Sequence, residues 1–501
     1  MNEVKQVAKW DFVDIPFKVK EDKTVNYFVD SYVYAIFTNG DKRLKVNGFY
    51  DDNNIFIIRF MPTIEGVWEY KTCSNIDELN KLSGKIKAIS PKENVHGLVE
   101  VDHKYHFAFS DKTPFYPFGT TAYVWNYQKP EIQAETLETL QKAPFNKIRM
   151  CVFPKHYDYN LREPEMTPFP GDIEHGFDLT HFNSKFFQKL EKQILALQKL
   201  NIEVDLILFH PYDRWGFSKM PEDVDMRYVS YVIARLSAFR NIWWSLANEF
   251  DLLTWKANTF WDKIFNKLVD EDPYNHLRSI HNWHCPPYHY RSNAHWYDHK
   301  KDWVSHVSIQ HHDMYFVPDW EEEYQKPIMI DECRYEGNMD LGWGNITGEK
   351  MTMLFWQTVV AGGYATHGET YMNDDEIIWW AHGGRLIGSS PARIAFLRKI
   401  MEEGPVKRLV PASRKSKIAA TRHWDATIGK NEDDNYYLIY FSDACPKYRH
   451  MDMLPEGKKY KAEIIDTWNM EIIALNEVID NKSTINLYSK PYIAIRLTAV
   501  E

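Results

Sequence analysis

Two apolar segments of this chain end in a glutamate. One is Ile242–Glu249, with the sequence Ile-Trp-Trp-Ser-Leu-Ala-Asn-Glu, and the other is Pro327–Glu332. A strand buried in a parallel sheet reads as a continuous apolar run, and the C-terminal ends of such strands carry the chemistry of a (β/α)8 barrel. Two carboxyl groups that meet there could act as acid and nucleophile on a glycosidic bond. We therefore take Glu249 and Glu332 as the candidate catalytic pair.

The elements that must position this pair lie between residues 103 and 405, where strand and helix patterns alternate. Helical spacing is clearest at 186–200 and 223–239, and Asn183 or Ser184 could cap the first helix. Eight strand–helix repeats in about 300 residues are typical of a TIM barrel. The eight candidate strands end near Thr121, Phe153, Pro211, Glu249, Trp283, His312, Glu332 and Glu369.

Both flanks of the barrel read as short alternating strands with turn residues between them. The pattern predicts an N-terminal β-sandwich domain over residues 1–102 and a C-terminal β-sandwich domain over residues 406–501. No low-complexity linker separates the three units, so we expect them to pack rigidly. The candidate strands are 32–37, 55–60 and 66–70 in the first flank, and 436–441, 460–467 and 492–496 in the second.

The fourth and seventh strands lie on opposite sides of a closed eight-stranded barrel, so Glu249 and Glu332 are expected to face each other across its mouth. Carboxyl groups about 5–5.5 Å apart allow one to attack the anomeric carbon while the other protonates the leaving oxygen. The acid needs a raised pKa, which the ionised partner helps to provide.

Four stretches carry a resemblance to a known family: 115–123, 145–150, 238–249 and 362–368. With them the whole chain resembles the apiosidase-like glycoside hydrolases, in which a β-sandwich precedes the barrel and a small β-domain follows it. Its catalytic strands are similar to those of the broader clan of barrel glycoside hydrolases. The resemblance implies that Glu249 is the acid/base and Glu332 the nucleophile. It also implies that Asn248 binds the sugar 2-hydroxyl and that Arg149 contacts Glu332 and keeps it ionised.

Further candidate substrate contacts lie at or just beyond other strand ends. Aromatic rings there could stack on sugars and histidines could bind hydroxyls, although packing or structural hydrogen bonds would explain each residue as well. Trp380 has the same claim as its neighbour Trp379, and Asp213 ranks second to His210. The candidates are Tyr123, His210, Trp283, His311, Tyr335, His367 and Trp379.

Composition and charge limit the classes of binding partner and the compartment that we expect for this protein. The net charge is −10 without a basic stripe, which disfavours nucleic acid, and no run of 18 apolar residues exists to span a membrane. Five scattered cysteines and an N-terminus without a signal-peptide core favour the cytoplasm. No zinc-binding motif is present among the histidines, so neither a metal nor a cofactor is expected.

Together these features predict an enzyme of carbohydrate metabolism, a retaining glycoside hydrolase acting on oligosaccharides, with plant-derived ones expected. One alternative is an inverting hydrolase with Asp213 or Asp331 as the base. Others are a non-catalytic carbohydrate-binding protein on an inactive barrel and, more distantly, a metal-dependent hydrolase. Assembly into a homo-oligomer is left open.

Overall fold

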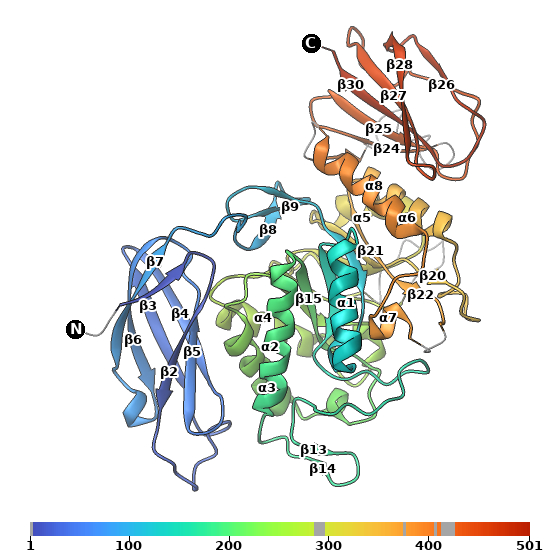
Figure 1. Ribbon diagram of the computed structural model, residues 1–501. Coiled ribbons are helices and arrows are strands. Elements are labelled where there is room, and N and C mark those ends of the chain that lie inside the picture. The colour runs from blue at the N-terminus through green and yellow to red at the C-terminus, as the bar shows by residue number, and fades with distance from the viewer. Residues whose placement is uncertain (1–3, 285–295, 374–376, 405–407, 412–425, 501) are drawn as a thin grey trace.

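The computed structural model describes residues 4–284, 296–373, 377–404, 408–411 and 426–500. The predicted boundary between residues 405 and 406, and also Cys285, lie outside these residues. Figure 1 shows a β-rich part at each end of the chain and a barrel surrounded by helices between them.

Eight parallel strands form the central sheet, and the mixed α/β fold matches the predicted TIM barrel. The sheet runs in the order β17-β16-β15-β12-β11-β21-β19-β18. Its two edge strands are linked by a parallel bridge between His281 and Ser308, so the barrel is nearly closed. The strands are β11 (Phe118–Thr121), β12 (Lys147–Cys151), β15 (Glu203–Phe209), β16 (Ile242–Ala247), β17 (Arg278–Ser279), β18 (Val307–Gln310), β19 (Ile328–Glu332) and β21 (Tyr364–His367).

Helices cover the outside of the barrel (Figure 1). The second begins at Ser184, because the Asn183 side chain caps it by accepting the Phe186 N–H. Between β17 and β18 the described residues contain no helix. The helices are α1 (Pro130–Lys142), α2 (Ser184–Lys199), α3 (Glu222–Leu236), α4 (Asn258–Glu271), α5 (Val317–Tyr324), α6 (Gly348–Val360), α7 (Trp379–His382) and α8 (Ser390–Glu403).

Several barrel strands end earlier than the sequence predicts. The fifth strand stops at Ser279 rather than near Trp283. His281 still donates its backbone N–H to Ala247 O on β16, at 3.0 Å. The Trp283 N–H instead binds Asp251 Oδ1, at 2.6 Å, so the chain leaves the sheet there and becomes a loop.

The N-terminal strands enclose a core of their own. Strand β4 pairs with β3 along its first part, through Lys42–Asn47, and with β5 along its second, through Gly48–Tyr50, so the sheet folds over that core. The strands are β1 (Lys5–Ala8), β2 (Val13–Lys18), β3 (Val33–Asn39), β4 (Lys42–Tyr50), β5 (Ile55–Phe60), β6 (Gly66–Ser74) and β7 (Ser83–Ile89).

A buried arginine joins the N-terminal domain to the barrel. Arg59 Nε lies 2.7 Å from Asp14 Oδ1, and its Nη1 donates to the Arg235 carbonyl at 2.8 Å and lies 3.1 Å from Glu191 Oε1. Because this side chain is only 5% exposed, its charge is compensated by close partners and not by water. The two units are therefore held in one orientation.

The C-terminal strands pack against the barrel through α6, which contacts β24 and β25, and residues of both units share one apolar core. The strands are β23 (Val410–Pro411), β24 (Thr427–Lys430), β25 (Tyr436–Tyr440), β26 (Tyr448–His450), β27 (Tyr460–Asp466), β28 (Glu471–Ile479), β29 (Thr484–Asn486) and β30 (Ile493–Ala499). The remaining short strands are β8 (Val99–Asp102), β9 (His106–Phe109), β10 (Pro114–Phe115), β13 (Gly171–Asp172), β14 (Gly176–Phe177), β20 (Glu336–Gly337) and β22 (Glu369–Thr370).

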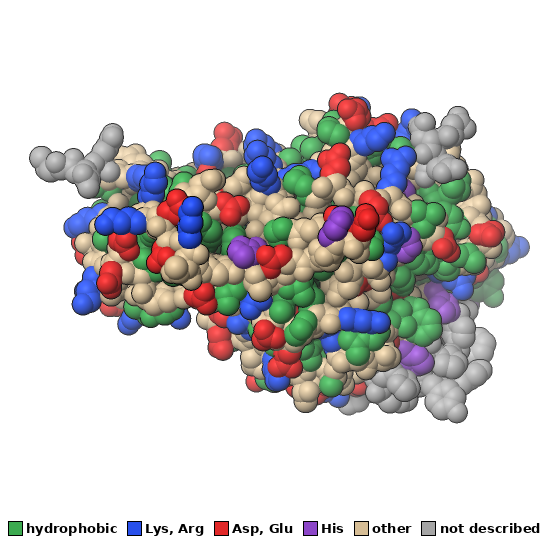
Figure 2. Space-filling view, turned by 90° about the horizontal axis from the view of Figure 1, so that it is seen from below, with side chains coloured by type: hydrophobic (Ala, Val, Ile, Leu, Met, Phe, Trp, Pro, Cys, Tyr) green, Lys and Arg blue, Asp and Glu red, His purple; other side chains and the backbone are tan. Residues whose placement is uncertain are grey.

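The surface carries both signs of charge. On the part of the face in Figure 2 that the structure describes, Lys and Arg are interspersed with Asp and Glu and form no continuous basic stripe. In the described residues, no helix has the length and apolar character needed to cross a membrane.

Candidate active site

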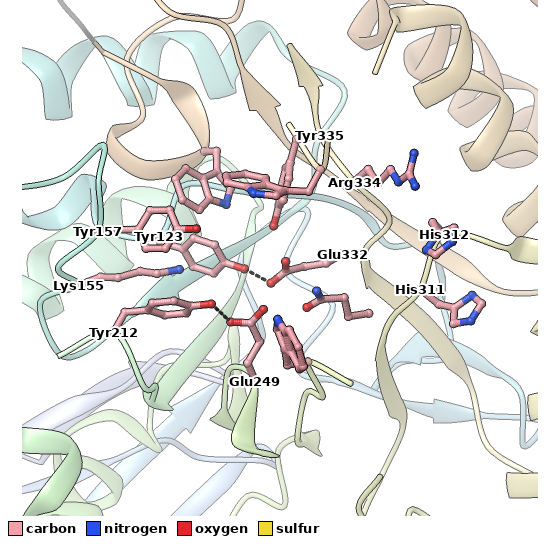
Figure 3. Close-up of a pocket in the computed structure, with 14 residues that line it drawn as sticks. Tyr123, Lys155, Tyr157, Tyr212, Glu249, His311, His312, Glu332, Arg334 and Tyr335 are labelled. Carbon is pink, nitrogen blue, oxygen red and sulfur yellow. Dashed lines mark hydrogen bonds between the residues drawn. The ribbon is translucent and has the colours of Figure 1, made fainter. Parts of the chain in front are cut away.

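Glu249 and Glu332 line one cavity of about 260 Å³ at the C-terminal ends of the strands (Figure 3). Glu332 is the last residue of β19, and Glu249 comes two residues after the end of β16. The Glu249 backbone is left-handed, with φ 51° and ψ 52°. Such a conformation is costly for a residue other than glycine and is found preferentially at functional sites.

Three polar groups hold Glu332. The Tyr123 hydroxyl donates to Oε1, Arg149 Nη1 lies 3.4 Å from the same oxygen, and His281 Nε2 lies 3.3 Å from it. Burial would raise the pKa of Glu332, but the neighbouring His281, Arg149 and Tyr123 lower this pKa to about 2. Glu332 is therefore a carboxylate at neutral pH.

A buried layer of charges lies beneath Glu332. Lys147 Nζ is 3.0 Å from Asp205 Oδ2 and 2.7 Å from Asp331 Oδ1, and Arg149 Nε is 3.2 Å from Asp205 Oδ2. All four side chains are fully buried, so the ion pairs replace the lost hydration. This network fixes Arg149, which comes from β12, against the glutamate of β19.

The environment of Glu249 is different. Its Oε2 accepts a hydrogen bond from the Tyr212 hydroxyl. Burial, and next the negative charge of Glu332, raise the pKa of Glu249 to about 8, although Lys155 and Tyr212 act in the opposite direction. The surroundings thus favour the protonated form of Glu249 and the ionised form of Glu332, as an acid and a nucleophile require.

Asn248 lies between these groups. Its Oδ1 accepts from Arg149 Nη2 at 3.1 Å and lies 3.2 Å from the Tyr123 hydroxyl, whose proton is directed to Glu332. Its Nδ2 has no hydrogen-bond partner among the described residues. The amide is therefore oriented by its oxygen and keeps its donor group for another partner.

The wall on one side of the cavity is built from aromatic rings around a lysine. Lys155 Nζ lies 3.8 Å from the ring centre of Tyr123, 4.2 Å from that of Tyr212 and 5.1 Å from that of Trp380. Figure 3 shows the ammonium group between the two tyrosines, both of which point toward the glutamates. Burial lowers the pKa of Lys155. The side chains lining the cavity are Tyr123, Lys155, Tyr157, Tyr212, Glu249, Trp283, Gln310, His311, His312, Glu332, Arg334, Tyr335, Trp343 and Trp380.

Four of the seven further candidates from the sequence line this cavity: Tyr123, Trp283, His311 and Tyr335. Trp283 is 48% exposed, which leaves its ring open to solvent. In Figure 3 His311 lies on the far side of the cavity from Lys155. Its Nδ1 accepts the Asp313 backbone N–H at 3.0 Å.

Three other candidates are not brought to the cavity. His210 Nε2 lies 3.3 Å from the Phe153 carbonyl, and His367 Nδ1 lies 3.3 Å from Thr120 Oγ1. Trp379 donates to the same Thr120 hydroxyl at 2.9 Å. Trp379 opens the short helix α7, in which successive side chains point about 100° apart. Its neighbour Trp380 therefore lines the cavity, and Trp379 packs in the core.

Sequence reasoning missed several lining residues. Tyr212 lies three residues after the end of β15, and Lys155 lies four residues after the end of β12. Their positions just beyond predicted strands could have identified both as residues of the barrel mouth. Trp343 lies in the loop after β20, far from any predicted strand end, and nothing in the sequence pointed to it.

Comparison with protein families matches the barrel to one family. Residues 102–407 match the apiosidase-like catalytic domain. Residues 6–75 and 424–498 match two domains of unknown function, DUF5060 and DUF5605. Among curated proteins, none matches this sequence.

Solved structures extend the likeness to the whole chain. A protein of Bacteroides vulgatus ATCC 8482 assigned to the glycoside hydrolases is 35% identical, with a TM-score of 0.90 over 99% of this chain and 100% of its own. A family 5 glycoside hydrolase of the same organism is 15% identical, with a TM-score of 0.61 over 80% of this chain and 94% of its own, and shares the fold. The chain thus belongs to the apiosidase-like family and is a glycoside hydrolase.

Proposed function

We propose that this enzyme cleaves O-glycosidic bonds of oligosaccharides with retention of anomeric configuration, using Glu332 as nucleophile and Glu249 as acid/base. The observation that carries the proposal is that two buried glutamates line one cavity, in surroundings that raise the pKa of Glu249 and lower that of Glu332. Glycosidic cleavage needs one carboxyl group that donates a proton and one that is ionised. Retention is proposed because Arg149 and Tyr123 hold Glu332 ionised in the cavity, where it can attack as the nucleophile.

In the first step Glu332 attacks the anomeric carbon and Glu249 gives its proton to the leaving oxygen. Glu332 loses its negative charge when it becomes an ester, and this removes the repulsion that helps to raise the pKa of Glu249. Glu249 is then a carboxylate that can take a proton from water for the second step. One residue thereby serves as acid and then as base.

Asn248 is proposed to bind the sugar beside the nucleophile. Its Nδ2 is a donor without a partner among the described residues, and its Oδ1 is fixed by Arg149. A hydrogen bond from such a donor to the 2-hydroxyl strengthens toward the transition state. The rings of Trp283, Trp343 and Trp380 offer stacking faces for further sugar units, which favours an oligosaccharide, with plant-derived ones as the first to test.

The inverting alternative is less well supported. Asp331 is fully buried, and it accepts hydrogen bonds from Lys147, Ser308 and Thr366. Asp213 accepts the backbone N–H groups of residues 215, 216 and 218. Both carboxylates are therefore occupied in holding the chain, and neither is among the residues that line the cavity.

The test begins with a panel of aryl glycosides and plant oligosaccharides, cleaved by the wild type, Glu249→Ala, Glu332→Ala and the control Glu174→Gln, which changes an exposed glutamate. We expect each alanine variant to lose at least roughly 10³-fold in kcat/KM, the scale on which removal of a key group acts. Product analysis by NMR at early times should show retention.

Added azide separates the two roles. In Glu249→Ala it should attack the glycosyl-enzyme and give a glycosyl azide of retained configuration. In Glu332→Ala it should replace the nucleophile and give the inverted azide. Inversion by the wild type, or full activity in either alanine variant, would overturn the assignment.

A further inference from the structure

A second group of ionisable side chains lies outside the catalytic cavity, beside the start of α8. Glu336 belongs to β20, His367 ends β21 and Glu369 belongs to β22. Strands β20 and β22 pair in parallel with Glu336 opposite Glu369. Each of the three residues offers one possible ligand atom, and these atoms lie within 4.8 Å of one another. None of the three side chains is more than 1% exposed.

Within the described part of the chain, His367 and Glu369 each have one polar side-chain atom with a hydrogen-bond partner and one without. His367 Nδ1 faces Thr120 Oγ1 at 3.3 Å, while Nε2 has no partner among the described residues. Glu369 Oε1 accepts the Ile387 backbone N–H, while Oε2 has no partner among the same residues. The free nitrogen and the free oxygen are both shielded from water, so solvent does not satisfy them.

In the part of the chain that the structure describes, the carboxylates of this group lack the buried lysine and arginine partners that the carboxylates beneath Glu332 have. Among the described residues, no lysine or arginine forms an ion pair with Glu336 or Glu369. Glu336 accepts the backbone N–H groups and hydroxyls of Ser389 and Ser390 at the start of α8, and the Tyr371 hydroxyl. A helix N-terminus also supplies about half a positive charge. A second buried carboxylate next to it still lacks a cation, and such a charge is costly unless it is paired or binds a metal.

We propose that Glu336, His367 and Glu369 bind one divalent transition-metal ion, of the Zn²⁺ or Mn²⁺ kind. One imidazole nitrogen with carboxylate oxygens suits these ions, whereas Ca²⁺ prefers six to eight oxygens. Ligands of bound metals usually have their other atoms held by a second set of hydrogen bonds. Thr120 provides such a bond to His367, and the Ile387 N–H provides one to Glu369. Both oxygens of Glu336 are hydrogen-bonded, so a serine hydroxyl would turn away from the oxygen that binds the ion, while the backbone N–H groups of Ser389 and Ser390 hold the carboxylate.

The ion would tie β20 and β22 to the start of α8. Tyr335, which lines the catalytic cavity, immediately precedes Glu336. Its ring packs so closely on Gly368 that a Cβ there would lie 1.9 Å from Tyr335 Cδ1. The ion therefore has a structural role, in which it fixes the backbone behind one wall of the cavity.

The experiment uses the full chain and does not depend on activity. Protein stripped with a chelator is dialysed and titrated with Zn²⁺ or Mn²⁺, with Ca²⁺ as the oxygen-preferring comparison. Bound metal is counted by elemental analysis, and Tm is followed by calorimetry. We expect one equivalent of Zn²⁺ or Mn²⁺ to remain bound and, at about a hundredfold excess over Kd, to raise the Tm by several degrees.

Two variants distinguish a specific metal site from adventitious metal binding and from a site in which Glu369 is simply a protonated, neutral acid. Glu369→Gln and His367→Gln should each lose the bound equivalent and the metal-dependent rise in Tm. Glu403→Gln, which changes an exposed residue of α8, should keep both. If the wild type retains no metal, or if Glu369→Gln binds as much as the wild type, the proposal is wrong. An unchanged or higher Tm of metal-free Glu369→Gln, together with absence of metal from the wild type, would identify Glu369 as a neutral acid.

Discussion

Replacing Tyr212 with phenylalanine tests how the protonation of Glu249 is set. The Tyr212 hydroxyl donates a hydrogen bond to Glu249 Oε2, and this bond lowers the pKa of Glu249. Phenylalanine keeps the ring and removes the donor. The ionised form of Glu249 then loses a partner, so its pKa should rise above about 8.

The size of the shift follows from the type of bond. A hydrogen bond to a charged group contributes about 1.5–3 kcal/mol, and one pKa unit corresponds to about 1.4 kcal/mol. The pKa of Glu249 should therefore rise by roughly one to two units. The fall of kcat/KM at low pH, which follows the ionisation of Glu332, should not move, because Glu332, whose pKa is about 2, is held by other residues.

The assay is the pH dependence of kcat/KM, measured from about pH 2 to 11, so that both limbs fall within the range, on an aryl glycoside that the wild type cleaves. Since catalysis needs protonated Glu249 and ionised Glu332, activity should fall as pH rises through the pKa of Glu249. In Tyr212→Phe this basic limb should move to higher pH. Tyr157→Phe is the matched control, because Tyr157 lines the same cavity, whereas the hydroxyl that donates to Glu249 belongs to Tyr212.

A basic limb that stays in place in Tyr212→Phe, or moves to lower pH, would refute the reasoning. An equal shift in Tyr157→Phe would mean that any change of the aromatic wall acts on Glu249, so that the hydrogen bond has no special role.

Three further outcomes are expected. The folded-state pKa of Glu249 is raised, so the contribution of this group to the free energy of unfolding is full below about pH 4 and is lost as pH rises to about 8. Glu249→Gln should therefore be a few kcal/mol more stable than the wild type above that pH. Denaturant unfolding at pH 5 and 9 measures the difference. Arg149→Lys should move the acid limb of kcat/KM upward and lower kcat by about 10²-fold, because lysine cannot contact Glu332 through the same planar fork. Arg59→Met should cost about 1–3 kcal/mol and lower the Tm, because Asp14 loses its partner and the buried Arg235 carbonyl loses a donor, although Glu191 keeps Arg235. Lys85→Ala, in an exposed ion pair, should cost less than about 1 kcal/mol.

Each of these expectations can fail in a specific way. A Glu249→Gln variant whose stability follows the wild type at both pH values would show that Glu249 titrates normally in the folded protein. An unchanged acid limb in Arg149→Lys would assign the low pKa of Glu332 to its other partners. Equal losses for Arg59→Met and Lys85→Ala would show that the domain contact is not held by buried charge.

The sequence by itself was sufficient for the architecture. Strands buried in a parallel barrel are mostly apolar, and polar residues at or just beyond their C-terminal ends face the open mouth. The runs ending at Glu249 and Glu332 satisfy both conditions, and this is why the barrel and its candidate pair could be read without a structure. The family resemblance implied that Arg149 contacts Glu332, and Arg149 Nη1 lies 3.4 Å from Glu332 Oε1.

Only the tertiary structure decided the charge of each carboxyl group and which side chains enter the cavity. Glu332 is held ionised by His281, Arg149 and Tyr123, whereas Glu249 is held protonated by burial and by Glu332 itself. These partners come from different strands of the barrel, so their distances are absent from any local pattern. The same holds for Glu336, His367 and Glu369, whose spacing matches no metal motif. A pKa depends on charges and burial within a few ångströms in space, and those neighbours are set by the closure of the barrel and not by the order of residues along the chain.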